Sequence, residues 1–304
     1  MTFWTDLLGL PFEVSYIDAG GIKTRRLVAG KGEPVVFLHG ISGHLETFVS
    51  VLPHFVKAGF QVHMIDMLGQ GFTGATGKVL SVAAMSKHLI DYLDACGLPK
   101  AHLVGLSLGG WTAATTAANH PERIFKMTLI APAGDPNSLP ARDPKFSEVQ
   151  RKSTLDGVRN NDKALTRKRL EMAVASPTAL TDEIVDCRYI VYHRPEFQAN
   201  IENLVAMFNM ETFNQEALKP QLLARITAPT LVVFGQEDPG QGNAEYLKKG
   251  IAHIKVQIFE GTGHWPAFER PEDFGNIAAA FHRGGLDAVV EGTLPKGEHV
   301  VRAA

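Results

Sequence analysis

The sequence predicts an α/β protein with a mostly parallel, doubly wound sheet and a helical lid inserted into it. Short apolar runs such as Pro34–Gly40 and Ala101–Leu106 suit strands that are buried on both faces. Stretches with helical spacing alternate with these runs, which is typical of a parallel sheet covered by helices on both sides. The alternation stops near residue 134 and resumes after residue 220, so a helical insertion is expected there.

The first half of the chain supplies most of the expected sheet. Two early strands are expected at residues 12–18 and 23–28, on either side of a glycine turn. Later strands are expected at apolar runs, and helices where apolar residues recur every three or four positions. The strands are Pro34–Gly40, Gln61–Met67, Ala101–Leu106 and Ile124–Pro132, and the helices are Glu46–Ala58, 82–95 and Ser107–Asn119.

The second half begins with the insertion and then completes the sheet. Residues 134–220 are mostly charged, helix-forming sequence and are predicted to form the lid. Residues 1–133 and 221–304 are predicted to form the core. In the second part of the core we expect strands at Ala228–Asp238 and Ile254–His264, a helix at Pro271–Arg283, and a loosely attached tail from Gly284 to Ala304.

The amino-acid composition excludes several classes of function. The apolar fraction of 45%, the charged fraction of 20% and the net charge of −2 over 304 residues are ordinary for a soluble domain. The cation-rich segment Arg151–Leu170 also holds two aspartates, so a solvated helix is favoured over a nucleic-acid site. Cys96 and Cys187 form neither a disulfide framework nor a zinc site. With no signal sequence or membrane span visible, we expect a cytoplasmic protein that needs no cofactor or metal ion, and a homo-oligomer is left open.

The stretch Gly105-Leu-Ser107-Leu-Gly109 fits the G-x-S-x-G pattern of a nucleophile elbow. In such an elbow a sharp strand-to-helix turn lifts the serine hydroxyl above the sheet, and flanking glycines avoid clashes there. The serine also lies at a helix N-terminus, which favours developing negative charge. The alternative is a serine that only caps the helix. Because the motif follows a buried strand and precedes a helix, Ser107 is the predicted nucleophile.

A serine nucleophile needs a base, and in a fold with such an elbow the acid and the histidine follow the serine in the chain. Asp238 lies just past the end of an expected strand, where open α/β sheets place functional groups. Its neighbour Glu237 is the rival. His264 lies in a glycine-containing loop after the following strand, and we choose it as the base from among 12 histidines. The predicted catalytic residues are therefore Ser107, Asp238 and His264.

An oxyanion hole is expected from two backbone amides. One is that of Leu108, directly after the nucleophile, and the other belongs to the loop after Pro34–Gly40. Ile41 is the preferred second donor and Ser42 the alternative. His39, in the same loop, is interpreted as a buried structural residue.

At this point the chain resembles the alpha/beta-hydrolase fold superfamily over about residues 12–283, through "LHG", "IDMLGQGFT", "GLSLGG", "GQED" and "GHWPAFERPEDF" in that order. Within it, "GHW" around Trp265 and the lid stretch "LTDEIVDCRY" are most similar to the meta-cleavage-product hydrolases. The resemblance implies that Arg188 holds a substrate carboxylate, whereas a surface salt bridge is the alternative. Ser42, Trp265 and Phe268 are expected at the substrate pocket.

Two departures affect what the resemblance implies. The family commonly has a glycine-proline-glycine run where this chain has Ile41-Ser42-Gly43, and asparagine where it has Leu106. We predict cleavage of a carbon–carbon bond in a 2-hydroxy-6-oxo-dienoate, as the resemblance implies. The alternative is a carboxylesterase or lactonase acting on a small apolar ester, since the same triad serves both reactions. A non-catalytic small-molecule receptor is the remote alternative.

Overall fold

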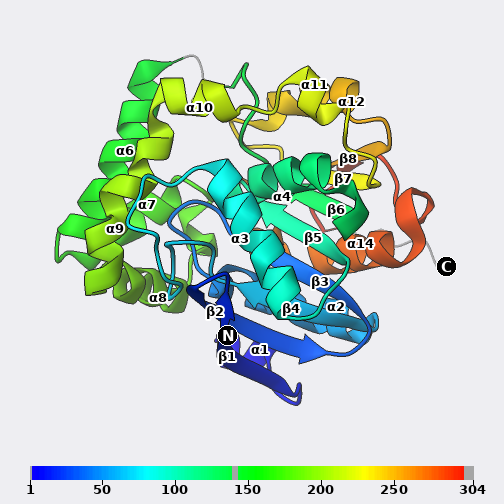
Figure 1. The fold of residues 1–304 in the computed structure, drawn as a ribbon, viewed down its shortest axis with the longest axis horizontal. Coiled ribbons are helices and arrows are strands. Elements are labelled where there is room, and N and C mark those ends of the chain that lie inside the picture. The colour runs from blue at the N-terminus through cyan, green and yellow to red at the C-terminus, as the bar shows by residue number, and fades with distance from the viewer. Residues whose placement is uncertain (1, 139–142, 298–304) are drawn as a thin grey trace.

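The computed structural model describes residues 2–138 and 143–297 and contains one nine-stranded sheet (Figure 1). Its strand order is β1-β2-β4-β3-β5-β6-β7-β8-β9. The pairs β1–β2 and β2–β4 are antiparallel and all other pairs are parallel, which confirms the predicted mostly parallel sheet. The strands are β1 (Phe12–Ala19), β2 (Ile22–Gly30), β3 (Glu33–Leu38), β4 (Phe60–Ile65), β5 (Ala101–Leu106), β6 (Ile124–Ile130), β7 (Thr230–Gly235), β8 (Ile254–Phe259) and β9 (Gly292–Leu294).

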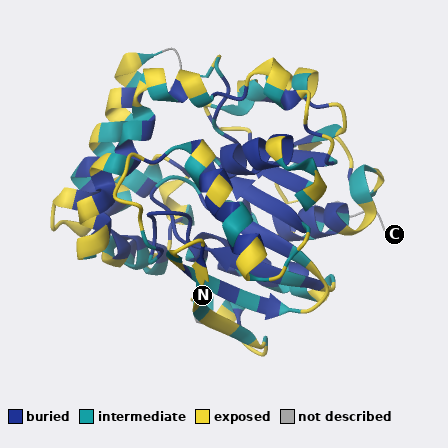
Figure 2. Cartoon of the chain, viewed as in Figure 1, coloured by how far each residue is buried: buried dark blue, intermediate teal, exposed yellow. Residues whose placement is uncertain are grey.

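Helices cover both faces of this sheet, as Figure 1 shows. Helices α3 and α4 pack on one face, and α2 and α14 pack on the other. The helices of the core are α1 (Phe3–Asp6), α2 (Leu52–Lys57), α3 (Val82–Ala95), α4 (Leu108–Asn119), α12 (Ala244–Gly250), α13 (Pro266–Glu269) and α14 (Pro271–Gly284). Strand β3 shows why two layers form: Val35 and Phe37 belong to one apolar cluster, whereas Val36 and Leu38 belong to the cluster on the opposite face. Figure 2 shows the resulting distribution of burial: the central strands are buried, and exposed residues lie on the outer helices.

The connection between β6 and β7 is helical and lies to one side of the sheet (Figure 1). It contains α6 (Pro144–Arg159), α7 (Lys163–Glu171), α8 (Asp182–Tyr192), α9 (Pro195–Val205), α10 (Met210–Glu216) and α11 (Pro220–Leu223). Asp143, Asp162 and Thr181 each accept a backbone N–H at the start of a helix, so side-chain caps fix where α6, α7 and α8 begin. The division of the chain at residues 134 and 220 stays a prediction.

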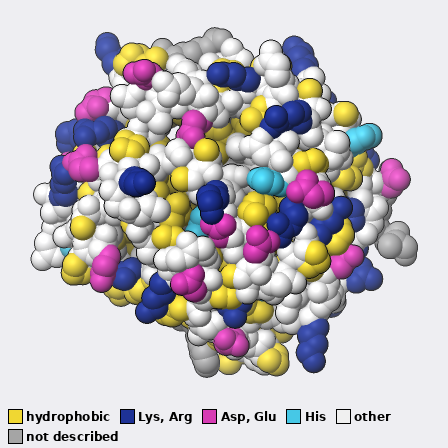
Figure 3. All heavy atoms as spheres, in the orientation of Figure 1, with side chains coloured by type: hydrophobic (Ala, Val, Ile, Leu, Met, Phe, Trp, Pro, Cys, Tyr) yellow, Lys and Arg dark blue, Asp and Glu magenta, His cyan; other side chains and the backbone are white. Residues whose placement is uncertain are grey.

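The cations of Arg151–Leu170 mostly lie on solvated faces of α6 and α7. Lys152 pairs with Asp156, Lys163 with Asp186, and Arg151 with Glu202. On the face of the molecule drawn in Figure 3, side chains of both charges are interspersed. No helix of residues 2–138 and 143–297 is both long enough and apolar enough to cross a membrane.

Two sequence expectations are wrong. Glu46–Ala58 is not one α-helix: a 3-10 helix (Leu45–Val51) precedes α2, because Pro53 near the start of α2 has no N–H to continue a helical ladder. The tail is not loosely attached over its described part, since β9 pairs with β8 and Arg270 donates to the carbonyls of Leu294 and Pro295. Residues 298–304 lie outside the described residues.

Candidate active site

Ser107 stands at a sharp turn between β5 and α4. Its backbone has φ 53° and ψ −111°, a conformation that residues other than glycine rarely adopt. The glycines on either side are required by close backbone contacts. A Cβ at Gly105 would lie 2.4 Å from the carbonyl oxygen of Gly109, and one at Gly109 would lie 2.1 Å from that of Leu38. The elbow therefore packs directly against the end of β3.

The strained backbone of the described chain is concentrated around Ser107. Three residues other than glycine have positive φ there: Ser42 (56°), Ser107 (53°) and Ala131 (41°). All three line the same pocket, and they follow the carboxyl ends of β3, β5 and β6. Such strain persists only where surrounding structure enforces it, and it often marks functional sites.

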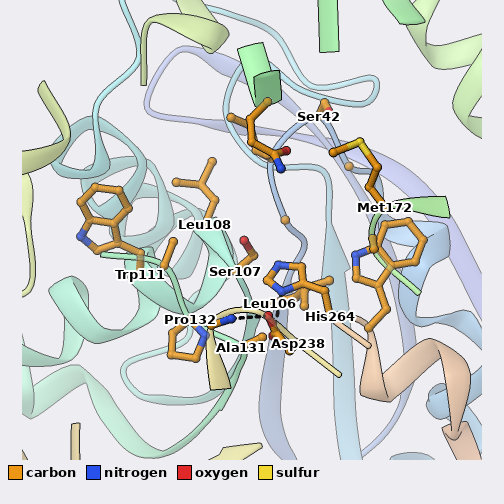
Figure 4. A pocket seen from close by; sticks show the side chains of 18 of the residues that line it. Ser42, Leu106, Ser107, Leu108, Trp111, Ala131, Pro132, Met172, Asp238 and His264 are labelled. Carbon is orange, nitrogen blue, oxygen red and sulfur yellow. Dashed lines mark hydrogen bonds and ion pairs between the residues drawn. The ribbon is translucent and has the colours of Figure 1, made fainter. Parts of the chain in front are cut away.

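Asp238 and His264 are joined by a hydrogen bond of 2.9 Å between Oδ2 and Nδ1 (Figure 4). The other carboxylate oxygen of Asp238 accepts the amide of Gly240 at 2.8 Å, so both oxygens are engaged. The bond to Asp238 places the proton of the neutral imidazole on Nδ1 and leaves Nε2 as an acceptor. Glu237, the rival acid, is exposed and takes no part in this pair.

Ser107 and His264 line one cavity of about 230 Å³, together with Asp238. In Figure 4 the serine hydroxyl projects into this cavity beside the imidazole ring. Within the described part of the chain the hydroxyl makes no hydrogen bond. The structure thus gathers all three predicted catalytic side chains, which come from the ends of β5, β7 and β8, at one edge of the sheet.

The amides of the loop after β3 are not equivalent. The N–H of Ser42 donates to Oε1 of Gln70 at 2.7 Å and is therefore occupied. Neither Ile41 nor Leu108 donates its backbone N–H to an acceptor among residues 2–138 and 143–297, and both residues line the cavity. The Ser42 side chain also lines the cavity, and its hydroxyl contacts Tyr192 Oη at 2.9 Å.

His39 holds this loop from below. Its Nε2 accepts the amide of Met67 at 3.0 Å, so Nδ1 carries the proton and donates to Gly40 O at 2.8 Å. Burial lowers the pKa of His39 to about 3, which keeps the ring neutral. His39 therefore has the buried structural role that the sequence predicted.

Arg188, on α8, lies inside the molecule and not on its surface. Its exposed fraction is 3%, and its Nε has no hydrogen-bond partner among the described residues. The guanidinium carbon lies 5.7 Å from the ring centres of both Trp265 and Tyr192. Arg188 and Trp265 both line the cavity. The alternative of a surface salt bridge is therefore wrong.

Comparisons with known proteins agree with this architecture. Residues 33–271 match the family model described as alpha/beta hydrolase fold. The chain belongs to the alpha/beta hydrolase family. It is similar to 2-hydroxy-6-oxo-6-phenylhexa-2,4-dienoate hydrolase of Comamonas testosteroni, with 28% identity over 84% of this chain and 89% of the relative.

The chain is also similar to a lipase and to a solved structure of a meta-cleavage product hydrolase. A monoacylglycerol lipase of Xenopus laevis is 27% identical over 92% of this chain and 84% of its own length. The crystal structure of a meta-cleavage product hydrolase from Pseudomonas fluorescens IP01 superposes with a TM-score of 0.76, at 25% identity, over 88% of this chain and 97% of that one. The protein is a hydrolase, and the predicted resemblance to meta-cleavage-product hydrolases is confirmed.

The remaining wall of the hydrolase pocket is mostly apolar and comes largely from the inserted helices. These residues include Phe146, Leu170, Met172, Met207, Phe208 and Phe213, which face Leu106, Leu108 and Trp111 of the core. Phe268, which we expected at the pocket, packs edge-on behind Trp265 instead, with ring centres 5.6 Å apart.

Sequence reasoning missed Arg169, Tyr192 and Gln70 at this site. Arg169 stands within a run of surface cations, and only its position on the helix distinguishes it from them. Among the described residues, no group of three or more His, Cys, Asp and Glu side chains could hold a metal ion.

Proposed function

We propose that this hydrolase uses Ser107, His264 and Asp238 to cleave a carbon–carbon bond in a substrate of the 2-hydroxy-6-oxo-dienoate type. The observation that carries the proposal is the position of Arg188. A buried guanidinium that lines the same cavity as Ser107 and His264, with no acidic partner in the described chain, suits a substrate that brings its own carboxylate. Similarity to hydrolases acting on such dienoates supports the same substrate class.

Each member of the triad has a separate role in the proposal. Asp238 orients His264 through Nδ1 and stabilises the imidazolium that forms. Nε2 of His264 acts as general base toward Ser107 or a water molecule. The amides of Ile41 and Leu108 donate to the oxyanion, and each such donor is worth about 3 kcal/mol in the transition state.

The carbon–carbon reaction adds water across the broken bond. The dienol first becomes a ketone, which turns the departing carbon into a stabilised carbanion equivalent. After attack on the C6 carbonyl, the carbonyl carbon gains hydroxyl and becomes an acid, while the departing carbon gains a proton. The inserted helices are proposed to act as a lid that shapes the apolar end of the pocket for the C6 substituent.

A carboxylic ester is the second candidate substrate. Leu106, directly before the nucleophile, gives the pocket an apolar side chain at a place where a polar contact to an acid would suit a dienoate. The similarity to monoacylglycerol lipases also favours it. An acyl-enzyme would then form on Ser107 as the alkoxide leaves.

The deciding experiment is a substrate panel assayed with wild type and with Ser107→Ala. We expect turnover of a phenyl-substituted 2-hydroxy-6-oxo-dienoate to exceed that of a nitrophenyl ester and of a lactone in kcat/KM. Ser107→Ala should lower every rate by about 10⁴-fold or more, because the nucleophile is lost. A dienoate rate well below the ester rate would replace the proposal by the esterase. Equal turnover by wild type and Ser107→Ala would remove the triad mechanism.

Arg188→Ala separates the two substrate classes further. Loss of the guanidinium should raise the KM for the dienoate about tenfold or more and leave the KM for a neutral ester within a factor of about two. Steady-state kinetics on both substrates measure this difference. An unchanged KM for the dienoate would show that Arg188 does not hold the carboxylate.

A further inference from the structure

Two arginines on different helices, and not one, face the substrate cavity. Arg169 lies on α7 and Arg188 on α8, and both line the cavity that holds Ser107 and His264. Neither forms an ion pair with an acidic residue in the described part of the chain. Their neighbours on the same helices differ, because Lys163 pairs with Asp186 and Arg167 with Asp182.

Both arginines keep N–H donors that have no acceptor among the described residues. Arg169 donates Nε to Thr154 Oγ1 at 3.3 Å, and its terminal nitrogens bind no acceptor among the described residues. Nε of Arg188 has no hydrogen-bond partner there either, although its side chain is almost fully buried. Tyr192 interacts with both guanidinium groups, but no carboxylate of the described residues pairs with either. Buried charges without a charged partner are costly, so this arrangement favours an anion beside them.

Arg169 and Arg188 give this end of the cavity a positive charge. Burial lowers the pKa of Arg169, Tyr192 acts in the opposite direction, and the charge of Arg188 lowers the pKa further. Tyr192 lies near both charges: burial raises its pKa, but the charges of Arg188 and Arg169, together with hydrogen bonding to Ser42 and Arg188, lower it overall. Among the described residues, Asp238 is the one that brings a carboxylate to the cavity lining, and His264 and Gly240 engage it.

We infer that Arg169 is a second substrate-binding residue, and that Arg169 and Arg188 together hold one acidic head group of the substrate. The head group that fits is a carboxylate with a neighbouring oxygen, as in a 2-hydroxy or 2-oxo acid. Two guanidinium forks from α7 and α8 offer more donors than the two oxygens of a simple carboxylate can accept. This inference rests on the proposed function, because it assigns a binding contact in the same pocket.

The two-arginine site has a consequence for selectivity. A neutral ester placed in the pocket would leave both guanidinium charges desolvated and unpaired, whereas an acid pairs both. Arg169 is therefore a specificity-determining residue that should act on substrate affinity and not on the chemical step.

The test uses binding to the inactive Ser107→Ala protein, so that no turnover is needed. The probes are a 2-hydroxy-6-oxo-6-phenyl dienoate and its methyl ester, with Kd measured by titration calorimetry. Arg169→Gln should weaken binding of the acid about tenfold and leave binding of the methyl ester unchanged. Lys168→Gln removes the same charge from the exposed next position of α7 and should change neither Kd.

The inference is overturned if Arg169→Gln leaves the acid-to-ester ratio of Kd values unchanged or weakens both probes alike. Should Arg169→Gln not fold, Arg169→Lys keeps the charge and loses the planar fork. Weaker acid binding with unchanged ester binding in that variant supports the inference, and unchanged acid binding rejects it.

A third probe separates this inference from the proposed reaction. The probe is 4-phenylbutyrate, which carries a carboxylate but no dienol, and its inhibition of ester turnover can be measured in the enzyme with Ser107 intact. If the dienoate is not cleaved and Arg169→Gln still raises the inhibition constant, the two-arginine site stands while the proposed substrate fails. If the dienoate is cleaved and Arg169→Gln changes no affinity, only the inference fails.

Discussion

At the scale of single residues, the site depends on backbone positions that few side chains tolerate. Ser107 was predictable because the glycines that its turn requires lie two positions away on either side, so the whole pattern is visible in a short stretch of sequence. Tyr192 and Arg169 were not, because they come from helices whose inward faces no short motif marks. Asp238 and His264 lie between these cases: the chain order and the strand ends indicated them, but only the structure brings Asp238 and not Glu237 to the imidazole.

The elbow glycines give a direct prediction of stability. Gly109→Ala should lower the free energy of unfolding by about 2 kcal/mol or more, because the new Cβ would collide with the Leu38 carbonyl. Gly242→Ala is the matched control, since nothing lies within 4 Å of a Cβ there. Urea denaturation of both variants measures the difference. Equal stabilities would show that the elbow can relax without loss.

At the scale of elements, the loop after β8 is hydrogen-bonded to the segment that follows α7. Glu269, on α13, accepts the amide of Gly263 on one carboxylate oxygen and the amide of Ala175 on the other, both at 2.8 Å. The amide of His264 donates to Ala173 O at 2.9 Å. Burial raises the pKa of Glu269, although these amides act in the opposite direction. We therefore expect Glu269 to fix the position of His264.

Glu269→Gln should lower kcat about tenfold and change KM less than about twofold, because an amide nitrogen cannot accept the second backbone N–H and the imidazole loses its fixed position. Glu272→Gln, at an exposed position nearby, is the control and should leave kcat unchanged. Steady-state kinetics with the preferred substrate, together with a thermal melt, measure both effects. A melting temperature that falls with no change in kcat would reduce Glu269 to a purely structural role.

Strands and helices of the core were predicted more closely than short or irregular elements. The strand Ala101–Leu106 was placed correctly because a buried apolar run has few alternatives. Gly292–Leu294 was missed because three residues containing a glycine give no periodic signal, and pairing with β8 alone makes them a strand. The 3-10 helix before α2 was missed because periodicity does not distinguish it from an α-helix.

At the scale of the whole molecule, several histidines are buried in the core, and the described residues include six of them: His39, His44, His63, His88, His102 and His282. Burial is the main cause that lowers the pKa of each, to about 4 for His63, His88 and His102. Their ring nitrogens bond to neighbours within the core, as with His88 Nε2 and Thr24 Oγ1 at 2.8 Å. In the unfolded chain these rings titrate near pH 6.5.

Acid should therefore destabilise the fold. Above about pH 6.5 the histidines are neutral in both states and the stability is complete; as the pH falls toward 4, the unfolded chain binds protons that the folded chain excludes. The free energy of unfolding should fall by up to about 1.4 kcal/mol per pH unit for each such histidine. Chemical denaturation from pH 7 to pH 5 measures the slope.

His88→Gln and His253→Gln form the matched pair for this prediction. The first removes a buried ring and should make the slope shallower, while the second removes an exposed ring and should leave it unchanged. A slope that is flat in wild type, or equal in all three proteins, would contradict the proposed origin of acid sensitivity.

The order of short motifs along the chain, from "LHG" to "GHWPAFERPEDF", made the family predictable at this scale. Family membership does not decide the substrate, because the pocket wall is assembled from side chains on separate helices whose contacts are not local in sequence. The lid boundaries, the cytoplasmic location and the oligomeric state stay predictions.

The pocket draws its parts from two sources: the reactive groups from loops at one sheet edge, and most of the remaining wall from a single inserted segment. Mutations in that segment can therefore alter which molecules are accepted while the machinery beneath is inherited intact. Engineering of substrate range should therefore begin with the segment between β6 and β7 and leave the loops at the sheet edge untouched.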